Sequence, residues 1–130
     1  MRRAFVVLAA ASVLVAAGCS SGGSSRPTTA AQLRIVTPAP DRPTVPDPAL
    51  RLELTKAKIV PGAGSGAHVR GDQGHIHVSV DGRLIAMAYT LDQQLPPMPP
   101  GRHTVVAEFV AADHAPFANR VVAAVSFDVR

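Results

Sequence analysis

Apolar and polar residues alternate in several short segments of this chain, and this period of two constrains its fold more than any other feature. The segments 50–55, 75–80 and 121–129 show the alternation most clearly, and it is typical of strands with one buried face. Five prolines between residues 38 and 48, and four between residues 96 and 100, interrupt any longer element. The sequence therefore predicts an all-β fold, a small antiparallel sandwich of immunoglobulin-like type.

Three further apolar segments, 33–36, 84–90 and 103–110, complete the predicted set of strands. Asp81 and Gly82 separate two of the strands, and Asp-Gly favours a two-residue hairpin because both central residues of a type I′ turn have positive φ. The segments between the strands are expected to be loops: 38–48, 61–74, 93–101 and 113–119.

The N-terminus has the parts of a bacterial export signal. Arg2 and Arg3 precede an uncharged, mostly apolar segment over residues 4–17, which is shorter than the about 20 residues of a membrane-spanning helix. The segment ends in Ala-Ala-Gly-Cys at residues 16–19, which resembles a lipobox with Ala in place of the usual Leu. We therefore expect residues 1–18 to be a lipoprotein signal peptide, and Cys19 to be lipidated with diacylglycerol and palmitate.

Cys19 is the only cysteine of the chain, so no internal disulfide can form. The alternative is an ordinary signal peptide with an incidental cysteine, but a lone free thiol is a liability in an oxidising compartment, and acylation removes it. Each buried CH₂ of the acyl chains contributes about 0.8 kcal/mol, so two or three chains give a stable anchor in the lipid bilayer.

The segment after this cysteine is small, polar and without periodicity. We expect residues 19–32 to form a lipidated cysteine with a flexible tether, and residues 33–130 to form the folded domain. The predicted location is extracytoplasmic, anchored to the cell membrane. The high content of Ala, Val and Arg indicates a GC-rich genome, and in an actinobacterium this would be the outer face of the plasma membrane.

The charge of the chain gives no support for nucleic-acid binding. The chain has 13 basic and 9 acidic residues, and without Arg2 and Arg3 the basic residues fall to 13 − 2 = 11, a formal charge of +2. These residues are scattered singly, with no basic run and no interleaved aromatic residues. We therefore expect no nucleic-acid partner.

The strongest chemical signal is the sequence Gly-His-Ile-His at residues 74–77. His75 and His77 are two apart on one predicted strand, so both imidazoles leave the same face and can share a metal ion. The inward face would carry Ile76, so the histidine pair faces outward or toward a covering loop. Further ligands would have to come from His103, His114 or Asp113. The alternatives are plain surface histidines, a hydrogen-bonding role that fixes the loops, or recognition of a small ligand.

Three blocks carry a family resemblance: residues 74–82 (GHIHVSVDG), 100–105 (PGRHTV) and 112–116 (ADHAP). They resemble the G-H-x-H…D, P-G-x-H-T and D-H-x-P blocks of a bacterial family of uncharacterised exported domains, the DUF4399-like group. The likeness covers residues 70–130 and implies an Ig-like β-domain in an exported protein, without an activity. It implies that any common site contains His75, His77, His103 and His114, whereas His68 falls outside the blocks.

No motif of an enzyme is present. The chain has no Gly-x-Ser-x-Gly, phosphate-binding loop or dinucleotide fingerprint, and its carboxylates occur singly. We therefore expect no enzymatic activity. Two hypotheses follow: a membrane-anchored binding or interaction module of unspecified ligand, or a lipoprotein that binds copper or zinc through these histidines.

Overall fold

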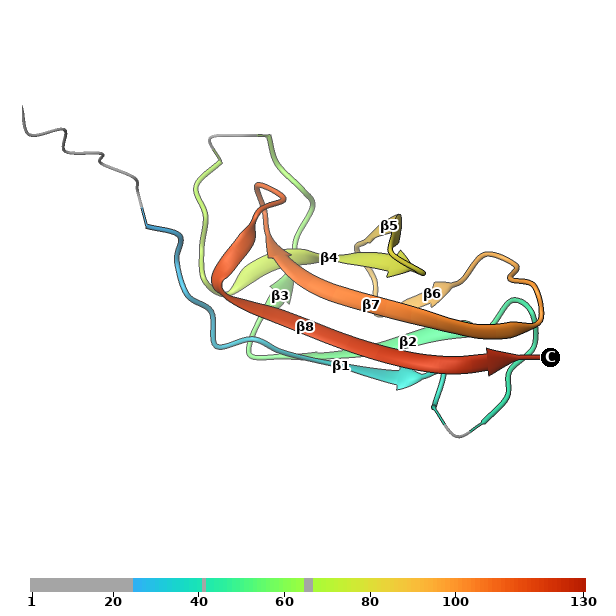
Figure 1. Ribbon diagram of the computed structural model, residues 1–130. Coiled ribbons are helices and arrows are strands. Elements are labelled where there is room, and N and C mark those ends of the chain that lie inside the picture. The colour runs from blue at the N-terminus through green and yellow to red at the C-terminus, as the bar shows by residue number, and fades with distance from the viewer. Residues whose placement is uncertain (1–24, 41, 65–66) are drawn as a thin grey trace, which may run out of the picture.

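The computed structural model describes residues 25–40, 42–64 and 67–130. The predicted signal peptide, Cys19 and residues 20–24 of the predicted tether lie outside these ranges. Within them, no helix is long and apolar enough to cross a membrane. The described part contains eight strands (Figure 1): β1 (Gln32–Thr37), β2 (Ala49–Thr55), β3 (Lys58–Ile59), β4 (Gln73–Val80), β5 (Arg83–Ala88), β6 (Asp92–Gln94), β7 (Gly101–Ala111) and β8 (Pro116–Val129).

The strands form two sheets that pack as a sandwich. One sheet has the order β1-β2-β6, and the other has the order β3-β4-β7-β8, with β5 also paired to β4. Neighbouring strands are antiparallel except β3 and β4, which run parallel. This architecture confirms the prediction of an all-β, sandwich-like fold.

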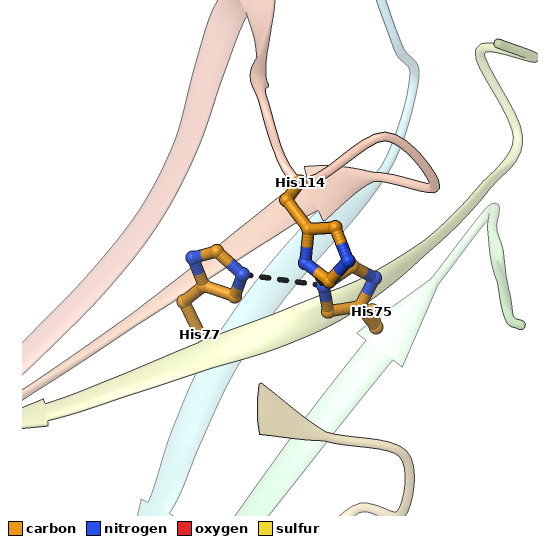
Figure 2. A group of neighbouring side chains, drawn as sticks. All are labelled: His75, His77 and His114. Atoms are coloured by element: carbon orange, nitrogen blue, oxygen red, sulfur yellow. Dashed lines mark hydrogen bonds between the residues drawn. The ribbon is translucent and has the colours of Figure 1, made fainter. Parts of the chain in front are cut away.

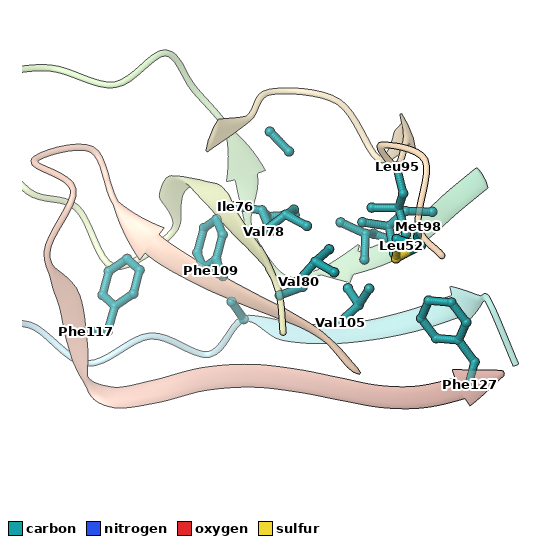
Figure 3. Close-up of a cluster of buried hydrophobic side chains, with 14 of the residues drawn as sticks. Leu52, Ile76, Val78, Val80, Leu95, Met98, Val105, Phe109, Phe117 and Phe127 are labelled. Atoms are coloured by element: carbon teal, nitrogen blue, oxygen red, sulfur yellow. The ribbon is translucent and has the colours of Figure 1, made fainter. Parts of the chain in front are cut away.

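The core lies between the two sheets and is built mainly from aliphatic side chains and three phenylalanines (Figure 3). Ile76 and Val78 of β4 are buried there, as the alternation predicts, and Leu50 and Leu52 of β2 face them from the other sheet. Burial of this apolar surface, at about 25 cal/mol per Å², is the main force that holds the sheets together.

The hairpin between β4 and β5 has the predicted two-residue turn, but its strands do not continue in simple register. Asp81 and Gly82 both have positive φ, 49° and 81°, as a type I′ turn requires. A β-bulge then interrupts the pairing, since Ser79 pairs with Leu84 whereas Val78 pairs with Ala86. The extra residue of the bulge reverses which face each following side chain of β5 occupies.

Three segments predicted as loops contain strand residues. β4 begins at Gln73 inside the predicted loop 61–74. β6 (Asp92–Gln94), which pairs with β2, overlaps the start of the predicted loop 93–101, and β7 begins at its last residue. β8 begins at Pro116 inside the predicted loop 113–119. Pro116 is the first residue of its strand, a place where the missing N–H removes no ladder hydrogen bond.

Part of the segment predicted as a tether packs on the domain. Thr29 and Asn119 are joined by two reciprocal hydrogen bonds of 2.8 Å, and both Thr29 and Ala31 are buried. Residues 26–31 therefore belong to the folded unit, in contrast to the flexible tether that composition alone predicts for them. The polar composition of this segment does not indicate the packing, because much of the packing depends on hydrogen bonds of the backbone and side chains and not on apolar contacts.

Candidate metal centre

β4 places two imidazoles on the face of the sheet opposite the core. The side chains of His75 and His77 alternate with those of Ile76 and Val78, which are fully buried between the sheets. His75 itself has no exposed surface, and His77 is half-buried. This outer face is therefore covered near His75. The histidine pair faces a covering loop, which is one of the two arrangements that the sequence analysis considered.

The loop between β7 and β8 brings a third imidazole to this face. The chain reverses over residues 112–115, with the His114 N–H donating to the Ala111 carbonyl at 2.9 Å and the Ala111 N–H donating to the Ala115 carbonyl at 3.0 Å. His114 has a φ of 67°, in the left-handed region that turns and functional loops use. Its ring lies over β4 beside His75 and His77 (Figure 2).

The ring nitrogens of these three histidines, which we call the three-histidine cluster, converge. Nε2 of His75 lies 3.2 Å from Nε2 of His77 and 3.0 Å from Nδ1 of His114. One nitrogen from each ring can be chosen so that all lie within 4.8 Å of one another. A metal about 2.0–2.1 Å from each nitrogen, at trigonal or tetrahedral angles, would place them about 3.3–3.6 Å apart. Small rotations of the rings are enough to reach that spacing.

Hydrogen bonds among the three rings do not satisfy their polar atoms. A neutral imidazole has one N–H donor and one acceptor nitrogen, and Nε2 of His75 faces two neighbouring nitrogens at once. The other nitrogen of this ring, Nδ1, is buried and has no hydrogen-bond partner among the described residues. A role limited to fixing the loop would leave the nitrogens that face Nε2 of His75 mismatched, and an unsatisfied buried polar group usually costs about 1–3 kcal/mol.

Burial keeps the imidazoles of β4 in their neutral form. Desolvation, together with a smaller effect of repulsion between like charges on the neighbouring rings of His114 and His77, lowers the pKa of His75 to about 4. Desolvation also lowers the pKa of His77, and His114 adds to this, while the carboxylate of Glu108 acts in the opposite direction. Neutral imidazole is the form that binds metal ions.

A tyrosine and a glycine complete the wall around the cluster, and the sequence analysis identified neither. The Tyr89 ring lies 5.3 Å from the His75 ring, measured between centroids. A Cβ on Gly62 would come within 2.7 Å of Nε2 of His114 and 3.1 Å of the Tyr89 hydroxyl oxygen, so only glycine lets this loop lie so close. Composition gives no signal for either residue, because their roles depend on long-range packing.

Both carboxylates next to the cluster are paired with arginines. Asp113 accepts hydrogen bonds of 2.5 and 3.0 Å from Arg26, and this contact lowers the pKa of the Asp113 carboxyl. Glu108, which pairs with His77 across the strands, accepts hydrogen bonds of 2.7 and 2.6 Å from Arg120. Asp113, considered as a ligand from sequence, is thus engaged by Arg26 instead.

The fourth histidine of the predicted set, His103, lies apart from the cluster. Val110 of β7 pairs with His75, and His103 lies seven residues earlier on the same strand, about 23 Å away. Its Nδ1 lies 2.7 Å from an Asp81 carboxylate oxygen, and its Nε2 lies 2.8 Å from the Pro99 carbonyl oxygen. The structure therefore brings together His75, His77 and His114, and gives His103 a separate hydrogen-bonded position.

Comparison with protein-family models, with curated proteins and with solved structures finds no match for this chain. The resemblance to the DUF4399-like group stays a prediction from the three sequence blocks. One of those blocks contains His103, which the fold uses to bind Asp81 rather than to join the cluster.

Proposed function

We propose that this chain is an exported lipoprotein that binds a transition-metal ion, copper or zinc, through His75, His77 and His114. It acts as a non-enzymatic binding module held at the membrane by the acylated Cys19. The convergence of three imidazole nitrogens within 4.8 Å supports this proposal more than any other observation. The wider interpretation, an interaction module of unspecified ligand, stays a prediction, and so does the absence of enzymatic activity.

The chemistry of the cluster favours a metal over a purely structural role. Three imidazoles with facing nitrogens match the ligand sets of copper and zinc, both of which accept imidazole in sites of low coordination number. A bound ion would accept electron pairs from all three rings. Hydrogen bonds between the rings cannot satisfy all of the facing nitrogens. The depressed pKa values of His75 and His77 reduce competition from protons.

The metal proposal is tested by isothermal calorimetry of the mature chain carrying Cys19→Ser, so that no thiol competes for the ion. We expect one-to-one binding of Cu(II) or Zn(II) with sub-micromolar Kd, lost in the double variant His75→Ala/His77→Ala. His68→Ala is the matched control, because His68 is exposed in a loop outside the cluster. Absence of saturable binding of zinc and of copper in both oxidation states, or equal losses in the control, overturns the proposal.

The membrane anchor is tested separately in the producing cell. Mass spectrometry of the membrane fraction is expected to find a mature N-terminus at Cys19 with its sulfur and amine modified by lipid. The variant Cys19→Ala should leave the membrane fraction while keeping its fold. An unmodified cysteine, or intact precursor in the cytosol, contradicts the anchor without bearing on the metal site.

A further inference from the structure

A methionine stands beside the three-histidine cluster on the same face of the sheet. Met87 of β5 pairs directly with His77 of β4, and directly opposed residues of antiparallel strands share a face, with Cβ atoms about 4.5–5.5 Å apart. Ala86 and Ala88, its neighbours in sequence, turn toward the core, and Ala88 is only 1% exposed whereas Met87 is 45% exposed. The side chain of Met87 therefore stands outside the core, next to His77.

The bulge in β5 is what places the methionine there. Had pairing continued from Ser79–Leu84 without interruption, His77 would oppose Ala86, and Met87 would oppose Ile76 on the core face. Methionine has three rotatable side-chain bonds and a polarizable thioether, so its sulfur can move toward the ring nitrogens of the adjacent cluster. Tyr89, two residues after Met87, lies against the ring of His75, two residues before His77.

The electrostatics around the cluster favour an ion of low charge. Imidazole binds a metal ion in its uncharged form, and no carboxylate joins the three histidines among the described residues. The two nearby acids, Glu108 and Asp113, have their charge offset by Arg120 and Arg26. A divalent ion beside the fully buried His75 would bring two uncompensated charges into a partly desolvated site, whereas a monovalent ion brings one.

We propose that the site selects Cu(I), with the Met87 thioether as a fourth ligand beside the three imidazoles. This inference rests on the proposed metal-binding function and narrows it. Cu(I) is monovalent and soft, and thioether sulfur with imidazole nitrogen is a donor set that suits it. The ion binds as Cu(I) and leaves as Cu(I), so the proposal requires no electron transfer by the protein.

The chain allows a direct test because it contains so few sulfur atoms. Its sulfurs are those of Cys19 and of Met1, Met87 and Met98, and Met1 belongs to the predicted signal peptide. In the mature chain with Cys19→Ser and Met98→Leu, Met87 is therefore the only sulfur. X-ray absorption of this variant loaded anaerobically with Cu(I) is expected to show one sulfur neighbour, which disappears when Met87→Leu is added.

Affinity gives the second measurement. Competition with a chromophoric Cu(I) chelator should show a loss of roughly tenfold or more on Met87→Leu, while Zn(II) affinity changes less than about twofold. Met98→Leu is the matched control, because Met98 is buried in the core away from the cluster, and it should leave both affinities unchanged.

The outcomes separate this inference from the function on which it rests. Cu(I) binding that needs His75 and His77 but shows no sulfur neighbour overturns the role of Met87 and leaves the three-histidine site intact. Equal losses of Cu(I) and Zn(II) on Met87→Leu overturn the selectivity, because the side chain would then act only by packing. No binding of any metal to the parent chain overturns both.

Discussion

The two histidine environments of this domain lie on the same pair of strands and have opposite chemistry. His103 has a carboxylate and a carbonyl as partners, and these hydrogen bonds with Asp81 and Pro99 raise its pKa. His75 is surrounded by other imidazoles, and burial lowers its pKa to about 4. The comparison shows that the partners provided by the fold, and not the residue type, decide whether the pKa of a histidine here is raised or lowered.

The largest expected effect is that a substitution in one environment changes metal affinity, whereas a substitution in the other changes only the stability of the fold. His75→Ala should weaken metal binding more than about 100-fold, because it removes the ring that contacts both other ligands. His103→Gln should leave the metal Kd unchanged and lower the free energy of unfolding by about 1–2 kcal/mol, since it disrupts two hydrogen bonds. Calorimetry and denaturant unfolding of both variants check this. Weaker metal binding by His103→Gln would contradict the separation of His103 from the three-histidine cluster.

The two histidines should also respond to pH in opposite directions in the metal-free chain. The folded pKa of His75 lies below the ordinary 6.5, so the fold loses up to about 3 kcal/mol of stability from this group as the pH falls from 6.5 to about 4. The folded pKa of His103 is raised, so its contribution is present below pH 6.5 and is lost as the pH rises through the folded value. NMR titration of the imidazole signals measures both.

A smaller effect is expected from filling the space beside His114. In Gly62→Ala the new Cβ would lie within 2.7 Å of ring atoms of His114. The imidazole must then move, because a side chain rotates more easily than the backbone of Gly62 shifts. Metal affinity should fall about tenfold, with the pKa of His103 unchanged. Calorimetry checks the affinity, and an unaltered Kd would show that His114 can rotate without leaving the ion.

The smallest effect concerns the Asp81 carboxylate alone. Asp81→Asn keeps a side-chain acceptor for the Thr104 N–H and tolerates the positive φ of this turn, but it removes the negative charge beside His103. Because Asp81 is about half exposed, the loss of stability should be below about 1 kcal/mol. The Asp81 pKa is lowered and that of His103 is raised, so the loss should be greatest between about pH 4 and 6.5. Unfolding curves across this pH range measure the loss of stability. The metal affinity of the variant should be unchanged and serves as the control.

Local pattern predicted the parts of the site that depend on neighbours in the sequence. Alternation placed His75 and His77 together on one face of β4, and Asp81-Gly82 indicated the turn that follows. The position of His114 in a loop was also predicted, within the segment 113–119. These features depend on periodicity and φ preferences, which a few consecutive residues determine.

By itself, the sequence determined the class of fold, the strand faces and the histidine pair, because these follow from side-chain alternation and turn chemistry. Only the tertiary structure decided which distant residues join that pair. The register of β4 against β7 places His103 at the opposite end from His75, and a single bulged residue in β5 turns Met87 from the core face to the side of His77. A shift of one residue reverses the face of every following side chain, and that shift is fixed by packing across the sheets.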